Sequence, residues 1–402
     1  MNDAVIVSGA RTPVGKFGGS FKNISAPDLG ATAIKSALNK AGISPDMVDE
    51  VVIGNAIQAA EAGYAARLAS IRAGIPHETP TVAINRQCSS GLEAINFAAQ
   101  LIRTGEAEII VAGGTENMSQ VPFMVNYQAR FDGLRMGDST LSDGLTDGLG
   151  CPVNRYHMGV TAENVAERFG VSREDQDELA MISHNRAVAA INGGKFKSQI
   201  TEVEVPQRRA DPISVSVDEG PRADTTLESL SSLRPVFKKD GTVTAGNASS
   251  INDGSAMVVL MSADKARTLE INPRMKWLTR GAAGVEPAIM GTGPVPAVNK
   301  AIKKSGMSLS DIDVVELNEA FASQALYCIR ELGLDLDKTN VNGSGISLGH
   351  PVGATGAIMT VKIMEEMEQS DSQLGLVTMC VGGGQGIATI FEAQTSDGNH
   401  TE

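Results

Sequence analysis

The chain has 402 residues, too many for one compact core and about right for two or three domains. Its formal net charge of −13 argues against nucleic acid as the main partner, because a phosphate backbone requires a basic surface. The four cysteines include no CxxC pair, which argues against a disulfide framework and against a zinc site. Without a membrane-spanning apolar run or a secretory signal, we expect a cytoplasmic protein with reduced thiols.

The first third of the sequence alternates between predicted strands and predicted helices. Short apolar runs predict strands at residues 4–7, 51–53, 81–84 and 108–112. One helix is predicted between the capping residues Ser25 and Asp28 and the terminating Gly42, and a second at about residues 89–104. This alternation predicts a doubly wound α/β layer.

The end of the chain repeats part of this pattern. Residues 37–44 resemble residues 301–308, and each copy leads into an apolar strand. Further along, residues 109–114 resemble residues 377–383. Two matches in the same order indicate two similar α/β halves, which we expect to stack face to face.

A region with a different pattern, from about residue 119 to residue 246, separates the two halves. Helices are predicted at residues 162–169 and 173–192, opened by Thr161 and Ser172. The following polar sequence carries the basic residues Arg208, Arg209, Arg222, Lys238 and Lys239. A long insertion of this kind is usually functional, and it can also form an oligomer contact.

Two cysteines lie at predicted strand ends. Cys88 precedes the helix at 89–104, where the helix dipole would lower its pKa and make it a nucleophile. Cys380 is followed by Val381 and three glycines, whose N–H groups could hold a developing oxyanion. Taken alone, either cysteine could instead be a small buried apolar residue.

Two polar residues add to this pattern. His350 lies between Gly349 and Pro351, and a rigid histidine that titrates near neutrality is the usual activator of a thiol. Asn318 ends a strand, where its amide could hold a water or cap a helix. Together they form a Cys–His–Cys set at strand ends of two related halves, where α/β proteins assemble active sites.

The sequence resembles the thiolase family over nearly its full length. The motifs that carry the resemblance occur in order along the chain, at residues 11–13, 85–91, 113–119, 244–249, 252–254, 318–321, 349–354 and 380–386. Two departures are small: Ser89 stands where the family commonly has Gly, and residues 343–347 carry more hydroxyl groups than usual.

The resemblance implies a five-layer αβαβα fold built from two duplicated halves with an inserted loop domain. The expected boundaries are an N-terminal half at 1–118 plus 247–269, a loop domain at 119–246, a C-terminal half at 270–394 and a tail at 395–402. It also implies a homodimer or homotetramer, with residues 119–138 as the contact.

The resemblance assigns roles to the four polar residues and one glycine. Cys88 would be acylated and His350 would activate it. Cys380 would take the α-proton of a second acyl-CoA. Asn318 would hold a water that forms one oxyanion hole with His350, and the N–H groups of Cys88 and Gly382 would form the other.

Further positions would bind the acyl-CoA. Ser249 would contact the pantetheine arm and Arg222 the adenine end. Met158 and Met290 would close the acyl pocket, and the pair of His157 and Met158 is typical of short-chain enzymes of the family. The remaining residues expected to line the substrate site are His157, Ala245, Ala320 and Phe321.

The expected reaction condenses two acetyl-CoA to acetoacetyl-CoA and CoA, or runs in reverse, with no metal or redox cofactor. The alternative within the family is a 3-ketoacyl-CoA thiolase of fatty-acid β-oxidation that acts on longer chains. A ketoacyl synthase would carry His or Asn in place of Cys380. A non-catalytic acyl-CoA-binding relative would not need Cys88, His350, Asn318 and Cys380 together.

Overall fold

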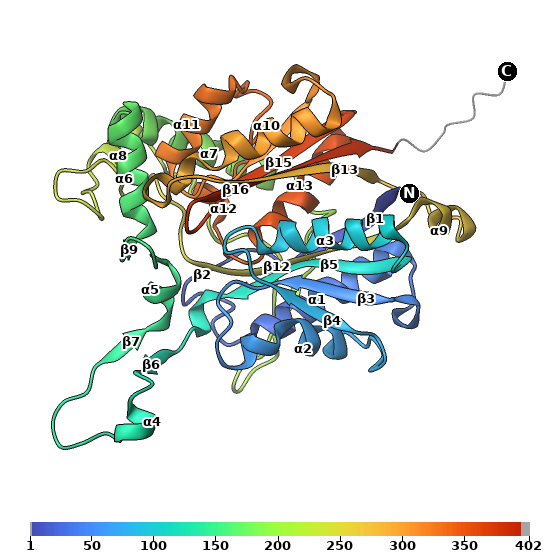
Figure 1. Cartoon of the computed structure of the whole chain (residues 1–402), viewed down its shortest axis with the longest axis horizontal. Helices are drawn as coiled ribbons and strands as arrows, with labels where there is room; N and C mark the ends of the chain where they lie inside the picture. The colour runs from blue at the N-terminus through green and yellow to red at the C-terminus, as the bar shows by residue number, and fades with distance from the viewer. Residues whose placement is uncertain (1, 395–402) are drawn as a thin grey trace.

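One mixed sheet runs through the molecule. The computed structural model describes residues 2–394, so the expected tail at 395–402 lies outside the described residues (Figure 1). The strand order is β14-β15-β16-β13-β1-β12-β5-β3-β4, with β2 beside β12. The bounds are β1 Ala4–Arg11, β2 Gly15–Lys16, β3 Glu50–Gly54, β4 Thr81–Ile84, β5 Ile109–Asn117, β12 Asn252–Ser262, β13 Met275–Gly284, β14 Val314–Leu317, β15 Leu374–Val381 and β16 Gln385–Ala393.

The sheet consists of two halves joined along a short seam. Strands β1, β12, β5, β3 and β4 form one half, and β13, β16, β15 and β14 form the other. The halves are joined where β1 pairs with β13 at Val5↔Lys276 and Ile6↔Met275. The strand predicted at residues 4–7 is the first part of β1, which continues to Arg11.

Helices cover both halves in layers. Helices α1 (Ala26–Ala41) and α2 (Ala65–Arg72) pack on the outer face of the first half, and α10 (Pro294–Ser305) and α11 (Ala322–Leu332) on the outer face of the second. Helices α3 (Ser90–Thr104) and α13 (Thr355–Gln369) lie between the halves and share one apolar core. The observed order of helix, sheet, helix, sheet and helix confirms the expected layers.

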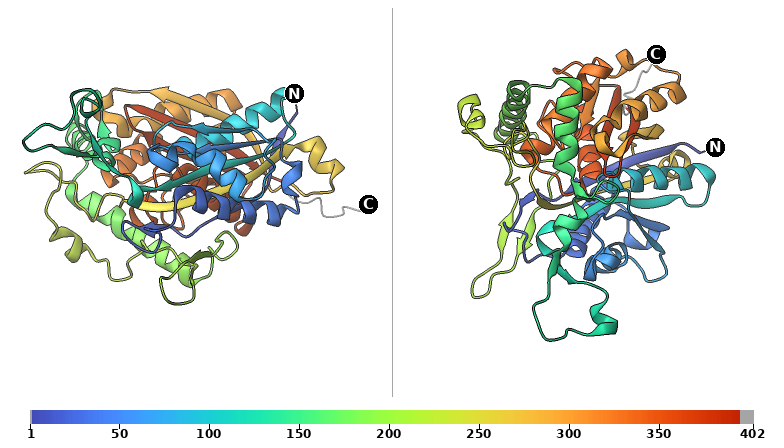
Figure 2. Two further views of the ribbon diagram at one scale, coloured as in Figure 1. Left: turned by 90° about the horizontal axis from the view of Figure 1, so that it is seen from below. Right: turned by 60° about the vertical axis from the view of Figure 1, so that its left-hand side comes forward.

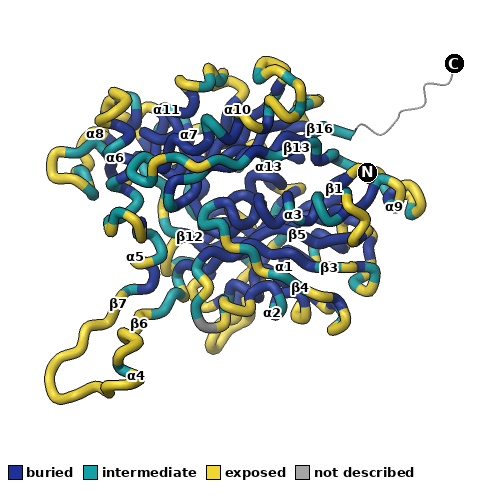
Figure 3. The backbone as a smooth tube through the Cα atoms, viewed as in Figure 1, coloured by how far each residue is buried: buried dark blue, intermediate teal, exposed yellow. Residues whose placement is uncertain are grey.

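The insertion between β5 and β12 contributes a helical face and a projecting arm. The arm spans residues 121–143 and is largely exposed (Figures 2 and 3).

The other α-helices and strands, in the insertion and after it, complete the described chain. They are β6 Phe123–Val125, α4 Ala129–Asp132, β7 Leu141–Asp143, α5 Gly144–Gly148, β8 Gly150–Cys151, β9 Tyr156–His157, α6 Met158–Phe169, α7 Arg173–Asn192, β10 Val203–Val205, β11 Ile213–Val215, α8 Leu227–Ser231, α9 Ala263–Thr268 and α12 Gly345–Leu348. No described helix is long and apolar enough to cross a bilayer.

Capping residues define several of these helices. Ser25 and Ser172 cap α1 and α7 as predicted, each accepting a hydrogen bond from the backbone N–H three residues later. The prediction for α6 was wrong: the helix begins before Thr161, and the side chain of His157 caps it by accepting from Gly159 N. An imidazole nitrogen with a lone pair can replace the usual capping oxygen, which the sequence pattern did not indicate.

Candidate active site

Cys88 lies in the tight connection between β4 and α3. The preceding residue, Gln87, has a positive φ of 46°, which is rare for a residue with a side chain and is found at functional turns. The hydroxyl of Ser90 fixes the turn, because it accepts from Arg86 N at 2.9 Å and donates to Gln87 O at 2.7 Å. The cysteine is therefore held at the start of a helix in a fixed conformation.

The environment of Cys88 corrects the sequence prediction about its acidity. Burial raises the pKa of the thiol to about 11, although the backbone N–H groups of Gly382 and Cys88 itself hydrogen-bond to the sulfur and lower it. Desolvation of the thiolate therefore outweighs the helix terminus. The thiol is protonated near neutral pH and needs a base before it can act as a nucleophile.

His350 is oriented so that one ring nitrogen can serve as this base. Its Nδ1 lies 2.7 Å from the Thr355 hydroxyl, and that hydroxyl donates its own proton to Pro351 O at 2.9 Å. Nδ1 must therefore carry the ring proton, which leaves a lone pair on Nε2. Burial lowers the pKa of His350 to about 4, so the ring is neutral at pH 7.

Asn318 follows strand β14 and faces this lone pair. Its Nδ2 lies 3.5 Å from His350 Nε2, and the asparagine is fully buried. Its Oδ1 has no hydrogen-bond partner among the described residues. An orphaned amide oxygen next to a basic nitrogen is a suitable place for a water or a polar substrate atom.

Cys380 ends strand β15 in an apolar cluster. Burial raises the pKa of its thiol well above the usual value, and the nearby Cys88 raises it further. The cluster also contains Met290, Ala320 and Phe321, with Met158 packed against it. The structure therefore places Cys380 near Cys88 and in one apolar cluster with Met158 and Met290.

A buried carboxylate ties the loop that carries His350 to the first half of the sheet. Glu116 accepts hydrogen bonds from the backbone N–H groups of Gly353 and Ala56 at 2.8 and 2.9 Å. Burial raises the pKa of Glu116 to about 7, while these donors lower it. Because the two donors come from different halves, Glu116 fixes the halves relative to each other at the site.

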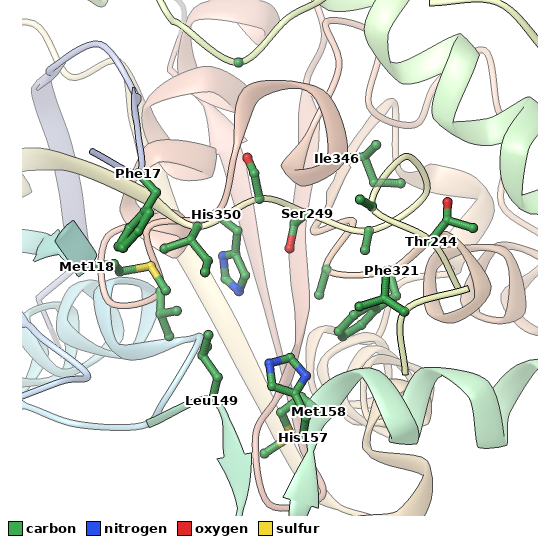
Figure 4. Close-up of a pocket in the computed structure, with 18 of the residues that line it drawn as sticks. Phe17, Met118, Leu149, His157, Met158, Thr244, Ser249, Phe321, Ile346 and His350 are labelled. Atoms are coloured by element: carbon green, nitrogen blue, oxygen red, sulfur yellow. The ribbon is translucent and has the colours of Figure 1, made fainter. Parts of the chain in front are cut away.

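A cavity of about 620 Å³ gives access to these groups. Figure 4 shows His350 and Ser249 at its centre, with His157, Met158 and Phe321 along another side. Ten predicted site residues line it: Cys88, His157, Met158, Arg222, Ala245, Ser249, Met290, Ala320, Phe321 and His350. Asn318, Cys380 and Gly382 are not part of this lining, and Asn318 and Cys380 are fully buried.

The walls of the cavity come from both halves and from the insertion. Backbone hydrogen bonds from Ser249 N to Ala320 O and from Ala322 N to Asn247 O join two wall segments at 2.9 Å each. His157 stacks on Phe237 with ring centroids 4.8 Å apart. Because His157 Nδ1 accepts from Gly159 N, its ring proton is on Nε2 and can be donated.

Comparison with protein families identifies the two halves. Residues 4–264 match the N-terminal domain of thiolase, and residues 271–393 match its C-terminal domain. The chain belongs to the thiolase family. This membership accounts for two cysteines, a histidine and an asparagine from distant segments meeting in one cavity.

Individual thiolases match nearly the full length of the chain. An acetyl-CoA acetyltransferase of Pseudomonas aeruginosa is 49% identical over 96% of this chain and 98% of its own. The crystal structure of the Bacillus anthracis acetyl-CoA acetyltransferase matches with a TM-score of 0.95 at 44% identity, covering 98% of this chain and 99% of that one. Human mitochondrial 3-ketoacyl-CoA thiolase in complex with CoA matches with a TM-score of 0.94 at 43% identity, covering 98% of each chain.

Several groups in this thiolase site escaped the sequence analysis. Glu116 acts through hydrogen bonds between distant segments, which no local pattern reveals, and Thr355 lies five residues after His350 but was not singled out. Of the five basic residues singled out in the insertion, only Arg222 lines the cavity. Lys16 and His184 line it as well, and the sequence analysis singled out neither of them.

Proposed function

We propose that this thiolase is an acetyl-CoA acetyltransferase, which condenses two acetyl-CoA into acetoacetyl-CoA and CoA and also catalyses the reverse thiolysis. The observation that carries the proposal is the packing of Met158, Met290, Phe321 and Cys380 in one apolar cluster. An acyl group placed between Cys88 and Cys380 meets this cluster, so each added methylene must displace protein. The P. aeruginosa and B. anthracis relatives carry the same activity in their names.

In the first half-reaction, Cys88 becomes acetylated. His350 Nε2 takes the thiol proton, and the sulfur attacks the thioester carbonyl of the first acetyl-CoA. The backbone N–H groups of Cys88 and Gly382, which point at the Cys88 sulfur, then hold the negative oxygen. The carbonyl re-forms as the CoA thiolate leaves, and this thiolate takes a proton from the thiol of Cys380.

The second half-reaction makes the carbon–carbon bond. The Cys380 thiolate takes an α-proton from the second acetyl-CoA, and the resulting enolate oxygen is held by His350 and a water on Asn318. The α-carbon attacks the acetyl carbonyl, the bond to Cys88 breaks, and the Cys88 thiolate recovers its proton from His350. A Cys380 thiolate that is costly to form in a buried site is a strong base once formed.

The inserted region and the cavity walls bind the coenzyme. Ser249 and the Nε2–H of His157 are placed to contact the pantetheine arm, with Ala245, Ala320 and Phe321 enclosing it. Arg222 contacts the nucleotide end.

The exposed apolar arm is the contact through which the protein forms a homodimer or homotetramer, because its apolar side chains stay exposed among the described residues of one chain. These side chains are Phe123, Val125, Tyr127, Phe131, Leu134, Met136 and Leu141.

The second candidate is a 3-ketoacyl-CoA thiolase for longer chains, favoured by the TM-score of 0.94 to the human enzyme of that name. The fold therefore does not distinguish the two candidate functions. The shape of the acyl end of the cavity has to distinguish them. We expect kcat/KM for thiolysis to fall roughly tenfold or more from acetoacetyl-CoA to 3-ketohexanoyl-CoA. Equal or higher kcat/KM for 3-ketodecanoyl-CoA would favour the second candidate.

A further inference from the structure

The side-chain amide of Asn318 is held by very few hydrogen bonds. Its Oδ1 has no partner among the described residues, and its Nδ2 makes one long contact of 3.5 Å with His350 Nε2. The backbone of Asn318 is fixed, because its N–H donates to Thr378 O at 3.0 Å. Packing against neighbouring groups must therefore determine the direction in which the amide points.

Helix α12 is in direct contact with this amide. A Cβ built on Gly345, the first residue of α12, would lie 2.6 Å from Asn318 Oδ1 and 2.8 Å from Glu319 O. Helix α12 has only four residues, too few for its own hydrogen bonds to keep it in place. The position of the Asn318 amide therefore depends on whatever holds α12.

The side chain of Glu319 holds α12 in two ways. Its buried carboxyl group accepts a hydrogen bond from the backbone N–H of Ile346, which belongs to α12. It also accepts from the hydroxyl of Ser183 on α7 at 2.6 Å, and this Oγ lies 2.8 Å from the Oγ of Ser347 on α12. One carboxyl group thus reaches α12 both directly and through a pair of buried hydroxyl groups.

The other oxygen of Glu319 is fixed by Asn340. The backbone N–H of Leu317 donates to Asn340 Oδ1 at 2.9 Å, which settles the orientation of the Asn340 amide. Asn340 Nδ2 then donates to Leu317 O at 2.8 Å and to Glu319 Oε1 at 2.9 Å. Burial raises the pKa of Glu319, while Ser183, Asn340 and the charge of Lys362 lower it. With both oxygens bonded, the carboxyl group is a rigid anchor for α12.

His350 is held by different groups. Its backbone N–H donates to Asn252 Oδ1 at 2.9 Å, and its Nδ1 lies 2.7 Å from the Thr355 hydroxyl. Neither contact involves Glu319 or α12. A change at Glu319 should therefore displace the Asn318 amide more than the imidazole.

We propose that Glu319 is a positioning residue for the second half-reaction. Through a backbone N–H of α12 and the Ser183–Ser347 hydroxyl pair, it keeps α12 against the Asn318 amide, which then holds its water at the enolate oxygen. This rests on the proposed function, since it takes that water to stabilise an enolate. It also gives a role to the additional hydroxyl groups of residues 343–347, which the reaction does not otherwise use.

Glu319→Met removes both acceptor oxygens and keeps a side chain of similar length. We expect exchange of the acetyl-CoA methyl protons with deuterium to slow by roughly tenfold or more, because a displaced Asn318 no longer positions the water. Acetylation of Cys88, followed by rapid quenching and mass spectrometry, should stay within about twofold, since α12 does not hold its base or its oxyanion hole. Glu319→Gln provides rescue, because its amide oxygen can accept from Asn340 and its amide nitrogen can donate to Ser183.

Ser183→Ala keeps the test decisive if Glu319→Met fails to fold. It should slow the exchange by about threefold or more and leave acetylation unchanged. Ser8→Ala is the matched control, because Ser8 is also buried and its hydroxyl donates to Ala37 O at 2.7 Å in the other half of the sheet.

Three results would overturn the positioning role. They are equal losses of exchange and acetylation in Glu319→Met, no recovery of exchange in Glu319→Gln, and equal exchange rates in Ser183→Ala and Ser8→Ala. A wild type that neither acetylates Cys88 nor exchanges the methyl protons would instead refute the proposed function.

Discussion

At the scale of single residues, the two cysteines differ in what surrounds them. Cys88 receives two backbone N–H groups at a helix start, whereas Cys380 lies in an apolar cluster. We predict that Cys88→Ala lowers thiolysis by roughly a thousandfold or more, because the proposed acyl-enzyme forms on the Cys88 sulfur. Peptide mass spectrometry after incubation with acetyl-CoA should show one acetyl group on Cys88 in the wild type and none in the variant.

Cys380→Ser should separate the two half-reactions. Acetylation of Cys88 should persist, because attack on the thioester needs His350 and the backbone N–H groups, and water can protonate the leaving CoA thiolate in place of Cys380. Condensation and exchange of the acetyl-CoA methyl protons with deuterium should be lost, since a serine hydroxyl is a far weaker acid than a thiol and does not form the anion that takes the α-proton. Exchange that survives while acetylation fails would mean that the two cysteines have the opposite roles.

The neutral state of His350 sets the pH dependence of the reaction. Its pKa is lowered to about 4, so the ring keeps its lone pair as the pH falls from 7 and loses it only near pH 4. The midpoint of the fall in kcat/KM toward acid pH should therefore lie well below about pH 6.5, which is the pKa of an ordinary histidine. A stopped assay across pH 4–8 measures this midpoint. A midpoint at about pH 6.5 would contradict the buried neutral ring.

Met158 tests the closed acyl pocket. Its methyl group lies close to Gly382, since a Cβ built there would be 3.3 Å from the Met158 Cε. Met158→Ala should open space and narrow the preference for acetoacetyl-CoA over 3-ketohexanoyl-CoA by roughly tenfold, with some loss on the short substrate. An unchanged ratio of kcat/KM values would show that Met158 does not limit chain length.

At the scale of elements, glycines allow the two halves to approach at the site. A Cβ built on Gly114 in β5 would lie 2.2 Å from Gly353 O, in the loop after His350. Gly114→Ala should therefore cost about 1–3 kcal/mol of unfolding free energy and lower kcat by displacing His350. Urea denaturation with Gly63→Ala as control measures this, because the nearest atom to a Cβ there is 4.0 Å away. Equal stability of both variants would contradict the close approach.

The elements also show what the sequence could and could not reveal. Helix α7 was predicted with its observed bounds, because Ser172 caps it and regular helix formers follow. The start of α6 was missed, because an imidazole provides its cap. Cys88, His350, Asn318 and Cys380 could be chosen from local motifs. The direction in which the pKa of Cys88 shifts could not be predicted, because desolvation depends on the segments that close over the thiol.

Contacts made only in the folded chain explain the remaining differences between the predicted and the observed site. Thr355 fixes the His350 tautomer from five residues further along the chain, but the sequence does not show that its hydroxyl meets the ring. Glu116 joins loops that come from opposite halves, and His184 faces Arg222 across 38 residues of sequence. These last two pairings have no periodicity or spacing that a single sequence displays, so only the folded chain identifies them.

At the scale of the whole molecule, the arm should control assembly. Phe131 and Leu134 are 78% and 67% exposed in one chain, which is unfavourable for apolar side chains unless another copy covers them. Replacing both by Ser should lower the molar mass measured by light scattering, from that of a tetramer to that of a dimer or from that of a dimer to that of a monomer. Leu336→Ser, at an exposed leucine outside the arm, is the control. An unchanged mass for the double variant would exclude the arm as the contact.

The central position of β1 has a consequence for synthesis on the ribosome. This strand is made first, yet its two neighbours in the sheet, β12 and β13, begin only at Asn252 and Met275. At roughly 5–20 residues per second, both of its edges stay without their partners for about 10–60 s. During that time β1 is an unpaired apolar strand, so a newly made chain depends on chaperones or on temporary pairing until its second half emerges.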